Sequence, residues 1–364
     1  MTGIEIALGT LNMEPVDEPC ILSCWVMKPE FFETVTGRDF FDDPTAVACE
    51  TFRRIGVNLC PQLALPYARG KPSTGDWKAH YEASTGRYRG PEEVKDAIEN
   101  LPEPEEIIRD FNHEKTRDDY AGHIQGMRER TGDDVLWISG FGQTDFMGGY
   151  TRWGYENYLE CMALYPEHIR RYWDHSGESA RLRNCAIVDA IRENDLAPFV
   201  YGGQDICFND GPICSPAMLR EYYFPSLKRA VEPLIENDVR IIWHCDGHIL
   251  PILDDLIDLG VSGFQGFQEE MGTTLEDMVK VKTKWGQKPI FWGSVSVTST
   301  LPFGTVEDVK RKVEHCFELA APGGGFGLAS TSSILPETPT ENILALYEHG
   351  REYGRKFLRN EATV

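Results

Sequence analysis

The sequence has few positive charges for its length and no long apolar run. Its 36 Lys and Arg residues stand against 58 Asp and Glu residues among 364, which gives a net charge of −22. Such a field repels phosphate backbones and anionic lipid, so nucleic acid and membrane surfaces are poor candidate partners. No apolar run approaches the roughly 18–20 residues that a membrane span requires. The N-terminus also lacks a basic region followed by an apolar segment, so we expect no signal peptide and a cytoplasmic location.

Several catalytic and cofactor-binding motifs are absent as well. None of the ten cysteines forms a Cys-x-x-Cys pair, which argues against a zinc ribbon or a thioredoxin-like redox site. We expect these cysteines to remain thiols. No Gly-x-x-x-x-Gly-Lys-Ser/Thr loop or Gly-x-Ser-x-Gly elbow occurs, and no Gly-x-Gly-x-x-Gly turn follows a predicted strand. The sequence therefore offers no familiar site for nucleotide phosphates and no familiar serine nucleophile.

Short runs of β-branched and aromatic residues alternate with amphipathic segments along the chain. The predicted strands are residues 20–26, 57–63, 135–141, 199–204, 240–244, 263–267, 290–293 and 326–329. Among the helix signals, Thr-Val-Glu-Asp at 305–308 is a capping box ahead of a helix at 309–319. Strands that alternate with helices predict a parallel sheet, and eight such units predict a closed (β/α)8 TIM barrel. We expect one domain over residues 1–364, with an N-terminal extension before the first strand.

Residues 67–116 interrupt this alternation. The segment is rich in Gly, Pro, Lys and Glu and separates two predicted strands by a long gap. We interpret it as an insertion over one face of the barrel. It could be a lid or a plain surface excursion, and its composition does not distinguish the two.

The most informative strand end is the segment VRIIWHCDGH at residues 239–248. In parallel barrels the reactive groups lie where strands end. Side chains alternate along a strand, so His244 and Asp246 share one face. An imidazole and a carboxylate on one face suit a divalent metal or a proton-transfer pair. The alternative is a structural histidine beneath a loop, with Asp246 in a turn.

A second strand end carries Asp205 and Cys207, which are also two residues apart. Together with His244 and Asp246 they could supply mixed sulfur, nitrogen and oxygen ligands to zinc. Taken alone, Cys207 is more typical of a buried thiol without a ligand role.

Long segments of the chain resemble the uroporphyrinogen decarboxylase superfamily. YGGQDICFNDGPICSPAMLR at 201–220 resembles its G-x-D…GP-x-x-SP-x-M-x-R segment. HCDGHILPILDDLIDLGVSGFQGFQ, LPFGTVEDVKRKVEHCFELAAPGGGFGLA and LPETPTENILAL are similar to its other motifs, in order, between about Trp25 and Tyr347. The resemblance implies a (β/α)8 barrel with its site at the C-terminal ends of the strands. The superfamily includes porphyrinogen decarboxylases and methyltransferases that work with corrinoid proteins.

The decarboxylase branch fits the sequence poorly. Its R-Q-A-G-R-Y segment corresponds here to CWVMKPEFFETVTG, which has no arginine pair. Pro61 and Gln62 stand near the place where an Asp of that branch is expected. A substrate with many carboxylates needs several cations to bind it. We therefore favour the corrinoid-dependent methyltransferase branch.

That branch binds zinc through a His-x-Cys pair and a later Cys. His244 matches the histidine, whereas Asp246 stands at the first cysteine and Ser332 lies near the second. Carboxylate in place of thiolate leaves a harder, more Lewis-acidic site that suits an ether oxygen better than a thiol. We therefore predict transfer of a methyl group from a small O-methylated compound to cobalt. The cobalamin would be carried by a separate corrinoid protein, because this chain has no corrinoid domain.

In this hypothesis His244 and Asp246, with Cys207 or Asp205, hold a metal or protonate the leaving oxygen. The predicted substrate-binding residues are Tyr201, Gln268, Ser294 and Ser332. Two alternatives stay open. One is a metal-free lyase or decarboxylase acting on a small acidic molecule, with Asp205 and His244 as acid and base. The other is a non-catalytic barrel with a degenerate site. The resemblance also implies a homodimer.

Overall fold

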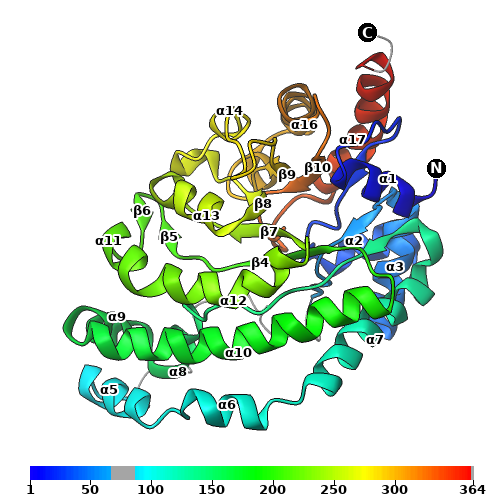
Figure 1. Ribbon diagram of the computed structural model, residues 1–364. Coiled ribbons are helices and arrows are strands. Elements are labelled where there is room, and N and C mark those ends of the chain that lie inside the picture. The colour runs from blue at the N-terminus through cyan, green and yellow to red at the C-terminus, as the bar shows by residue number, and fades with distance from the viewer. Residues whose placement is uncertain (67–86, 362–364) are drawn as a thin grey trace.

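The computed structural model describes residues 1–66 and 87–361 and has an α/β fold around a curled parallel sheet (Figure 1). Six strands pair in parallel in the order β1, β10, β9, β8, β7 and β4. Their bounds are β1 (Cys20–Ile21), β4 (Phe199–Gly203), β7 (Arg240–Cys245), β8 (Val261–Gly266), β9 (Ile290–Val295) and β10 (Phe326–Ser330). Each strand overlaps a predicted run, because strands covered on both faces are apolar along most of their length.

The two remaining predicted strands pair with each other in parallel. They are β2 (Leu59–Cys60) and β3 (Leu136–Trp137). Single parallel bridges join this pair to the larger sheet, from Leu22 to Leu59 on one side and from Ser139 to Val200 on the other. The parallel strands therefore follow one another around a curve in chain order. Beyond β4 the chain forms a small antiparallel hairpin of β5 (Cys207–Phe208) and β6 (Gly211–Pro212).

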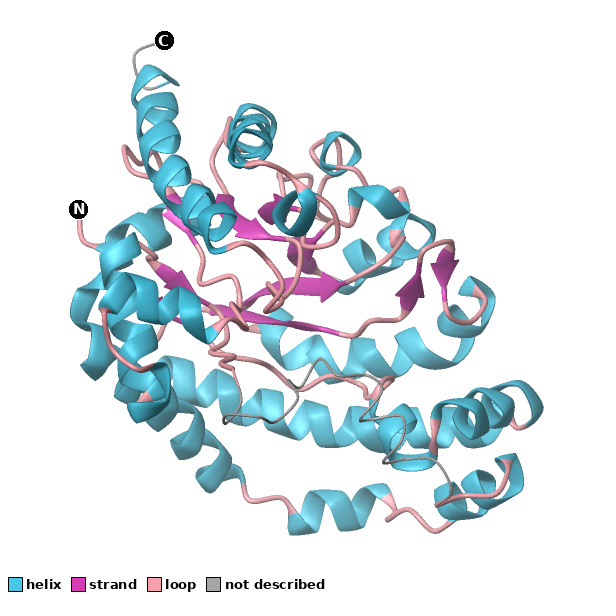
Figure 2. Ribbon diagram, turned by 180° about the vertical axis from the view of Figure 1, so that it is seen from behind, coloured by secondary structure: helices cyan, strands magenta, loops and turns pink. Residues whose placement is uncertain are grey.

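Helices surround the strands on the outside, as the view from behind shows (Figure 2). Their bounds are α1 (Gly3–Leu11), α2 (Pro29–Thr36), α3 (Pro44–Ile55), α5 (Pro91–Glu99), α6 (Pro104–Asp110), α7 (His113–Thr131), α8 (Gly148–Trp153), α9 (Tyr155–Leu164), α10 (Pro166–Glu193), α11 (Pro216–Met218), α12 (Phe224–Glu236), α13 (Leu253–Leu259), α14 (Leu275–Met278), α15 (Thr300–Phe303), α16 (Val306–Ala320) and α17 (Thr340–Glu361). The predicted capping box is present at the start of α16. The Thr305 side chain accepts from the Asp308 N–H, and the Asp308 carboxylate accepts from the Thr305 N–H.

Helix α1 is the predicted N-terminal extension, and it lies against β1, β2, β3 and β10. The Gly325 N–H donates to the Thr10 carbonyl at 3.1 Å just before β10 begins. Arg240, the first residue of β7, donates to the Leu11 carbonyl and to Asn12 Oδ1, each at 2.8 Å. The bonds to Thr10 and Leu11 satisfy carbonyls at the C-terminal end of α1 that have no partner within the helix.

The predicted insertion at 67–116 is only partly within the described residues, because 67–86 lie outside them. Its described part forms α5, α6 and the start of α7. Helices α5 and α6 pack against the outer side of α10, and α5 also packs against α9 (Figure 1). Arg171 of α10 and Glu103 form an ion pair at 2.9 Å that joins these layers. This part of the insertion therefore adds an outer helical layer.

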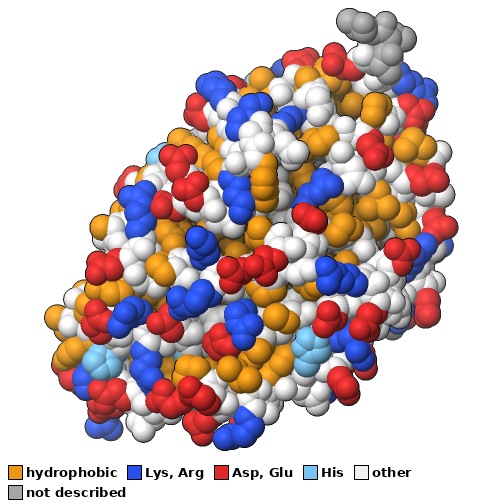
Figure 3. Space-filling model, viewed as in Figure 1, with side chains coloured by type: hydrophobic (Ala, Val, Ile, Leu, Met, Phe, Trp, Pro, Cys, Tyr) orange, Lys and Arg blue, Asp and Glu red, His pale blue; other side chains and the backbone are white. Residues whose placement is uncertain are grey.

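Charged residues of both signs are interspersed over the face shown in Figure 3, despite the net charge of −22. None of the helices within 1–66 and 87–361 is long and apolar enough to cross a membrane.

Inside the sheet the strand register sets side chains of adjacent strands next to one another. His244 of β7 lies opposite Gln265 of β8, and Gln265 lies opposite Trp292 of β9. Two polar residues, His244 and Gln265, therefore lie side by side near the C-terminal ends of strands that are otherwise largely apolar.

Candidate active site

Two neighbouring strands position the predicted site residues. β4 and β7 pair with Gly203 opposite His244. Asp205 lies two residues beyond the end of β4, and Asp246 directly follows the last residue of β7. Because parallel strands end at the same edge of a sheet, Asp205 and Asp246 emerge on either side of the imidazole. Gly203 permits this close approach, since a Cβ atom there would lie 1.7 Å from the His244 carbonyl oxygen.

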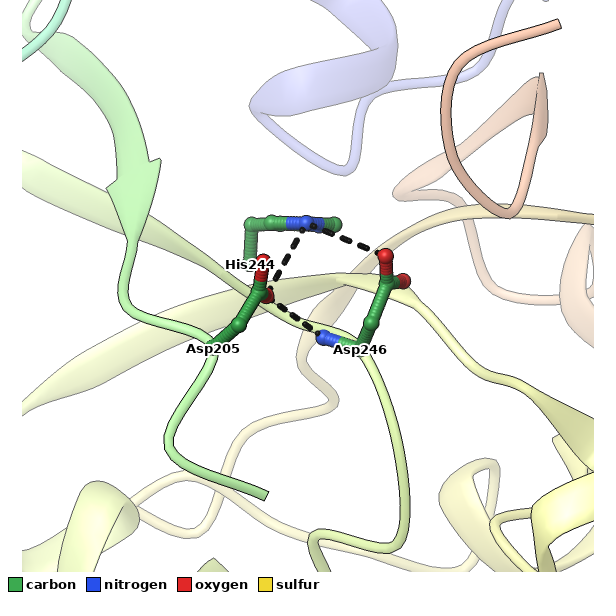
Figure 4. Close-up of side chains that lie close together, drawn as sticks. All are labelled: Asp205, His244 and Asp246. Carbon is green, nitrogen blue, oxygen red and sulfur yellow. Dashed lines mark hydrogen bonds and ion pairs between the residues drawn. The ribbon is translucent and has the colours of Figure 1, made fainter. Parts of the chain in front are cut away.

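The three side chains converge at the strand ends (Figure 4). His244 Nε2 lies 3.5 Å from Asp205 Oδ1 and 3.9 Å from Asp246 Oδ2. One donor atom from each residue lies within 4.8 Å of the other two. Asp205 Oδ1 also accepts the backbone N–H of Asp246 at 3.0 Å, which ties the two strand ends together. The structure thus brings together three of the residues that the sequence analysis selected.

Burial and charge act in opposite directions on His244. Burial lowers the pKa of its imidazole, but the negative charges of Asp246 and Asp205 and a hydrogen bond to Gln265 outweigh burial, so the pKa is raised. Burial also raises the pKa of Asp246, and the charge of Asp205 adds to this rise, whereas His244 and Ser332 oppose it. Oδ1 of Asp246 is buried without a hydrogen-bond partner. The cluster therefore favours a positive charge at its centre, either a proton on His244 or a metal ion.

A buried amide supports the imidazole from the neighbouring strand. Gln265 Oε1 lies 2.6 Å from His244 Nδ1 and accepts from the Tyr201 hydroxyl at 2.9 Å. Gln265 Nε2 donates to the carbonyls of Ser330 and Thr331, at 3.1 and 2.9 Å. Gln265 is only 2% exposed. These contacts hold the ring with Nε2 directed toward the two carboxylates.

A cavity of about 590 Å³ opens beside the carboxylates. It is lined by Tyr150, Tyr155, Asp205, Cys207, Phe208, Asn209, Ile213, Asp246, Gly247 and Gln268. The β5–β6 hairpin contributes Phe208, which is 54% exposed at the edge of the cavity. Aromatic and aliphatic groups make up much of the wall, and the two carboxylates supply its charge. Such a lining suits a small molecule with an apolar body and a few polar groups.

A second cavity of about 350 Å³ adjoins His244 and is lined by residues that follow β2, by residues in and after β3, by residues in β4, and by His123 of α7. Its polar lining includes Gln62, Ser139, Gln143 and Tyr201. Neither cavity has a Lys or Arg among the described residues that line it. A substrate with many carboxylates would therefore find no Lys or Arg among these described lining residues, in agreement with the poor match to the decarboxylase branch.

The predicted substrate-binding residues occupy different surroundings. Gln268 lines the larger cavity, and its Oε1 accepts the Gly247 N–H at 2.8 Å. Tyr201 lines the smaller cavity. Ser332 interacts with Asp246 and lowers its pKa. Ser294 lines neither cavity among the described residues, and its hydroxyl lies 3.3 Å from the carbonyl of Phe267.

Cys207, the tentative sulfur ligand, lies near the cluster but not in it. The cluster of donor atoms found in the described residues consists of Asp205, His244 and Asp246. Cys207 lines the larger cavity, and its thiol neighbours that of Cys245. The cluster at this strand end therefore offers one nitrogen and two carboxylates.

The sequence analysis did not assign roles to Gln265, Tyr150 or Tyr155. Gln265 is polar within the apolar run VSGFQGF, which is a local signal of an inward-facing functional side chain. Its pairing with His244 depends on the register between β7 and β8. Tyr150 and Tyr155 come from α8 and α9, far from any strand end, so strand-end reasoning could not select them.

Comparison with known proteins gives the site a family context. The profile of the uroporphyrinogen decarboxylase (URO-D) family matches residues 144–353 of the chain. Two curated relatives are named methylcobamide:CoM methyltransferase MtaA. One, from Methanosarcina barkeri (strain Fusaro / DSM 804), is 28% identical over 237 residues, 63% of this chain and 62% of the relative. The other, from Methanosarcina barkeri, is 28% identical over 159 residues, 42% of this chain and 43% of the relative. The matches thus span less than two thirds of either relative.

A solved structure also resembles the chain along nearly its full length. It is a methyltransferase from Methanosarcina mazei, with a TM-score of 0.60 at 18% sequence identity. The alignment covers 97% of this chain and 99% of that one. At this identity the likeness is one of fold. It extends the similarity to the N-terminal part of the chain, which the family profile leaves unmatched.

Proposed function

The chain belongs to the uroporphyrinogen decarboxylase family, and on this basis we propose that it is a corrinoid-dependent methyltransferase. We infer that it moves a methyl group from a small O-methylated compound to the cobalt of a separate corrinoid protein. The names of the curated relatives place methyl transfer and a cobamide in the same reaction. The choice of an O-methylated donor rests on one observation: the cluster of Asp205, His244 and Asp246 contains no thiolate.

The donor set fits a zinc ion. Zinc bonds of about 2.1 Å in a tetrahedron set neighbouring ligand atoms about 3.4 Å apart. The separations of 3.5 and 3.9 Å from His244 Nε2 to Asp205 and Asp246 are close to that value. The buried, unpartnered Oδ1 of Asp246 is a further sign that a cation belongs here. His244, Asp205 and Asp246 would hold the ion, and Cys207 would stay outside the ligand set.

Zinc, when bound, would act as a Lewis acid toward the ether oxygen of the methyl donor. One nitrogen and two carboxylates make a harder ligand set than thiolates, which suits oxygen rather than sulfur. In the absence of metal, His244 Nε2 can carry a proton between the same two carboxylates. The methyl carbon–oxygen bond would then break with its electron pair left on oxygen, and this proton would neutralise the oxygen. Cobalt(I) supplies the pair for the new bond to carbon.

The larger cavity is the proposed place for the methyl donor. It has about 590 Å³ of space and opens directly onto Asp205 and Asp246. Its apolar wall would hold the body of the donor, and Gln268 on the same wall would fix a polar group of it.

We also propose that the eight parallel strands form a closed (β/α)8 barrel in one domain, and the single bridges at Leu22 and Ser139 support this.

The test combines metal analysis with a methyl-transfer assay. Purified protein is loaded with zinc, dialysed, and analysed for metal by mass spectrometry. It is then mixed with cob(I)alamin and a panel of small methyl ethers, and methylcobalamin is followed by its absorbance. We expect about one zinc per chain and methylcobalamin from at least one ether. A matched panel of methylated thiols should give much slower transfer.

Two results would contradict the proposal. One is the absence of methylcobalamin with every ether when a cognate corrinoid protein replaces free cobalamin. The other is release of CO2 from small carboxylic acids by the metal-free protein, which would favour the decarboxylase alternative.

A further inference from the structure

The orientation of the Gln265 amide is fixed by the backbone beneath it. The amide nitrogen has two N–H groups, and they donate to the carbonyls of Ser330 at 3.1 Å and Thr331 at 2.9 Å. Turning the amide over would set its oxygen against two carbonyl oxygens, which cannot donate. At 2% exposure, Gln265 has no solvent to replace these bonds. Oε1 is therefore the atom that faces His244.

An amide oxygen only accepts hydrogen bonds, so both of its neighbours must donate. The Tyr201 hydroxyl donates to Oε1 at 2.9 Å. His244 Nδ1 lies 2.6 Å from the same oxygen and must carry a proton. This holds for the neutral and the charged imidazole alike, because Nδ1 is protonated in both. Nε2 is then the only ring nitrogen free to change its state, and it faces Asp205 and Asp246.

We propose that Gln265 is a positioning residue that holds His244 as the Nδ1–H tautomer, so that proton exchange and metal binding both occur at Nε2. Metal-bound histidines commonly donate their second N–H to a carboxylate, which makes the imidazole a stronger electron donor. A neutral amide in that place gives a weaker donor and leaves a bound metal more electrophilic. The metal part of this inference rests on the proposed function, whereas the tautomer part does not.

The tautomer can be measured directly by 15N NMR of metal-free protein labelled at histidine. The chain has nine histidines, and the signals of His244 are identified by their loss in His244→Gln. We expect wild-type protein at a pH where His244 is neutral to show a protonated Nδ1 and an unprotonated Nε2. Gln265→Met, which offers no acceptor of comparable strength, should show a mixture of tautomers. Gln265→Glu keeps an acceptor and should restore the single tautomer.

Zinc affinity gives a second readout. Loss of a hydrogen-bond partner of a metal-bound histidine typically costs about 10–100-fold in affinity, so Gln265→Met should raise the zinc Kd by about that factor. Tyr201→Phe is the matched control, because it removes the other donor to Oε1 and leaves the bond to His244 intact. Its zinc Kd should stay within about threefold of wild type.

The inference is overturned if wild-type protein carries its proton on Nε2, and this result does not depend on any variant folding. It is also overturned if folded Gln265→Met keeps a single tautomer and the wild-type zinc Kd. Protein with the expected tautomer that neither binds zinc nor transfers methyl groups would contradict the proposed function alone. Active protein with the opposite tautomer would contradict the role of Gln265 alone.

Discussion

The two ends of the parallel strands use polar residues in opposite ways. At the N-terminal ends, polar side chains pair with backbone groups of neighbouring segments. Asn58 Oδ1 accepts the Ile21 N–H at 2.9 Å, and its Nδ2 donates to the Pro19 carbonyl at 2.8 Å. Lys288 Nζ donates to three carbonyls, those of Ala320, Pro322 and Gly324, at 2.6, 2.7 and 2.6 Å. Donors meet acceptors here, which stabilises the fold.

At the C-terminal ends, groups of like charge are held together. Asp205 and Asp246 both face His244, and Oδ1 of Asp246 is buried without a hydrogen-bond partner. Such an arrangement costs stability unless a proton or a cation neutralises it. The difference indicates that the N-terminal ends secure the sheet while the C-terminal ends are arranged for chemistry, which is the arrangement known from parallel barrels. Substitutions at the two ends should therefore separate stability from activity.

The largest effect should come from His244→Ala. Methyl transfer should fall by about 10²–10⁴-fold, because the variant lacks the group that we propose to bind the metal or protonate the leaving oxygen. The melting temperature should stay within a few degrees of wild type, since the side chain lies at the cavity rather than in the packed core. The rate is measured by methylcobalamin formation and the stability by circular dichroism. His315→Ala, on the surface of α16, is the control and should change neither. Near-wild-type turnover by His244→Ala would contradict the claim that the C-terminal strand ends are arranged for chemistry.

Asn58→Ala should have the opposite profile. The substitution leaves a buried N–H and a buried carbonyl without partners, and each such loss costs about 1–3 kcal/mol. We expect the free energy of unfolding in urea to fall by about 2–4 kcal/mol. Methyl transfer at 20 °C should remain within about twofold of wild type. The exposed Asn100→Ala should alter neither quantity. If Asn58→Ala lost activity while keeping wild-type stability, the claim that the N-terminal strand ends serve stability rather than activity would be wrong.

The smallest effect is a pH dependence at Lys288. Burial, with a contribution from Lys282, lowers the pKa of Lys288 to about 8. In the unfolded chain the pKa of a lysine is about 10.4. Between these two pKa values the unfolded state therefore binds more protons than the folded state. The free energy of unfolding should therefore rise with pH across this window, relative to Lys288→Met. Urea unfolding of both proteins at pH 7.5, 8.5 and 9.5 measures the difference. The exposed Lys280→Met should follow wild type, and equal slopes for wild type and Lys288→Met would refute the prediction.

Much of the fold follows from local sequence. All eight predicted strands overlap an observed one, because strands buried on both faces are continuous apolar runs that stand out between polar segments. The capping box at Thr305 is present at the start of α16, since the bonds that make it lie within four residues. The observed strands β1, β2 and β3 are only two residues long, shorter than their predicted runs. Their limits depend on how neighbouring strands diverge, which is a tertiary property.

The candidate site divides in the same way. Strand alternation predicted that His244 and Asp246 share one face. The spacing of Asp205 and Cys207 predicted that they could face the same cavity, and in the structure both line the larger one. Sequence could not decide between Asp205 and Cys207 as the third member of the cluster. The structure decides for Asp205, because the chain turns into the β5–β6 hairpin at Cys207 and its thiol neighbours Cys245 instead.

The amino-acid order by itself determined which segments become strands, which helices are capped, and which strand ends carry ionisable groups, since each depends on neighbours along the chain. Only the packed molecule decided that Gln265 lies against His244 and that tyrosines from α8 and α9 wall the larger cavity. These contacts join residues that are distant in sequence. They depend on strand register and on how the helices pack outside the sheet, and no local pattern encodes either.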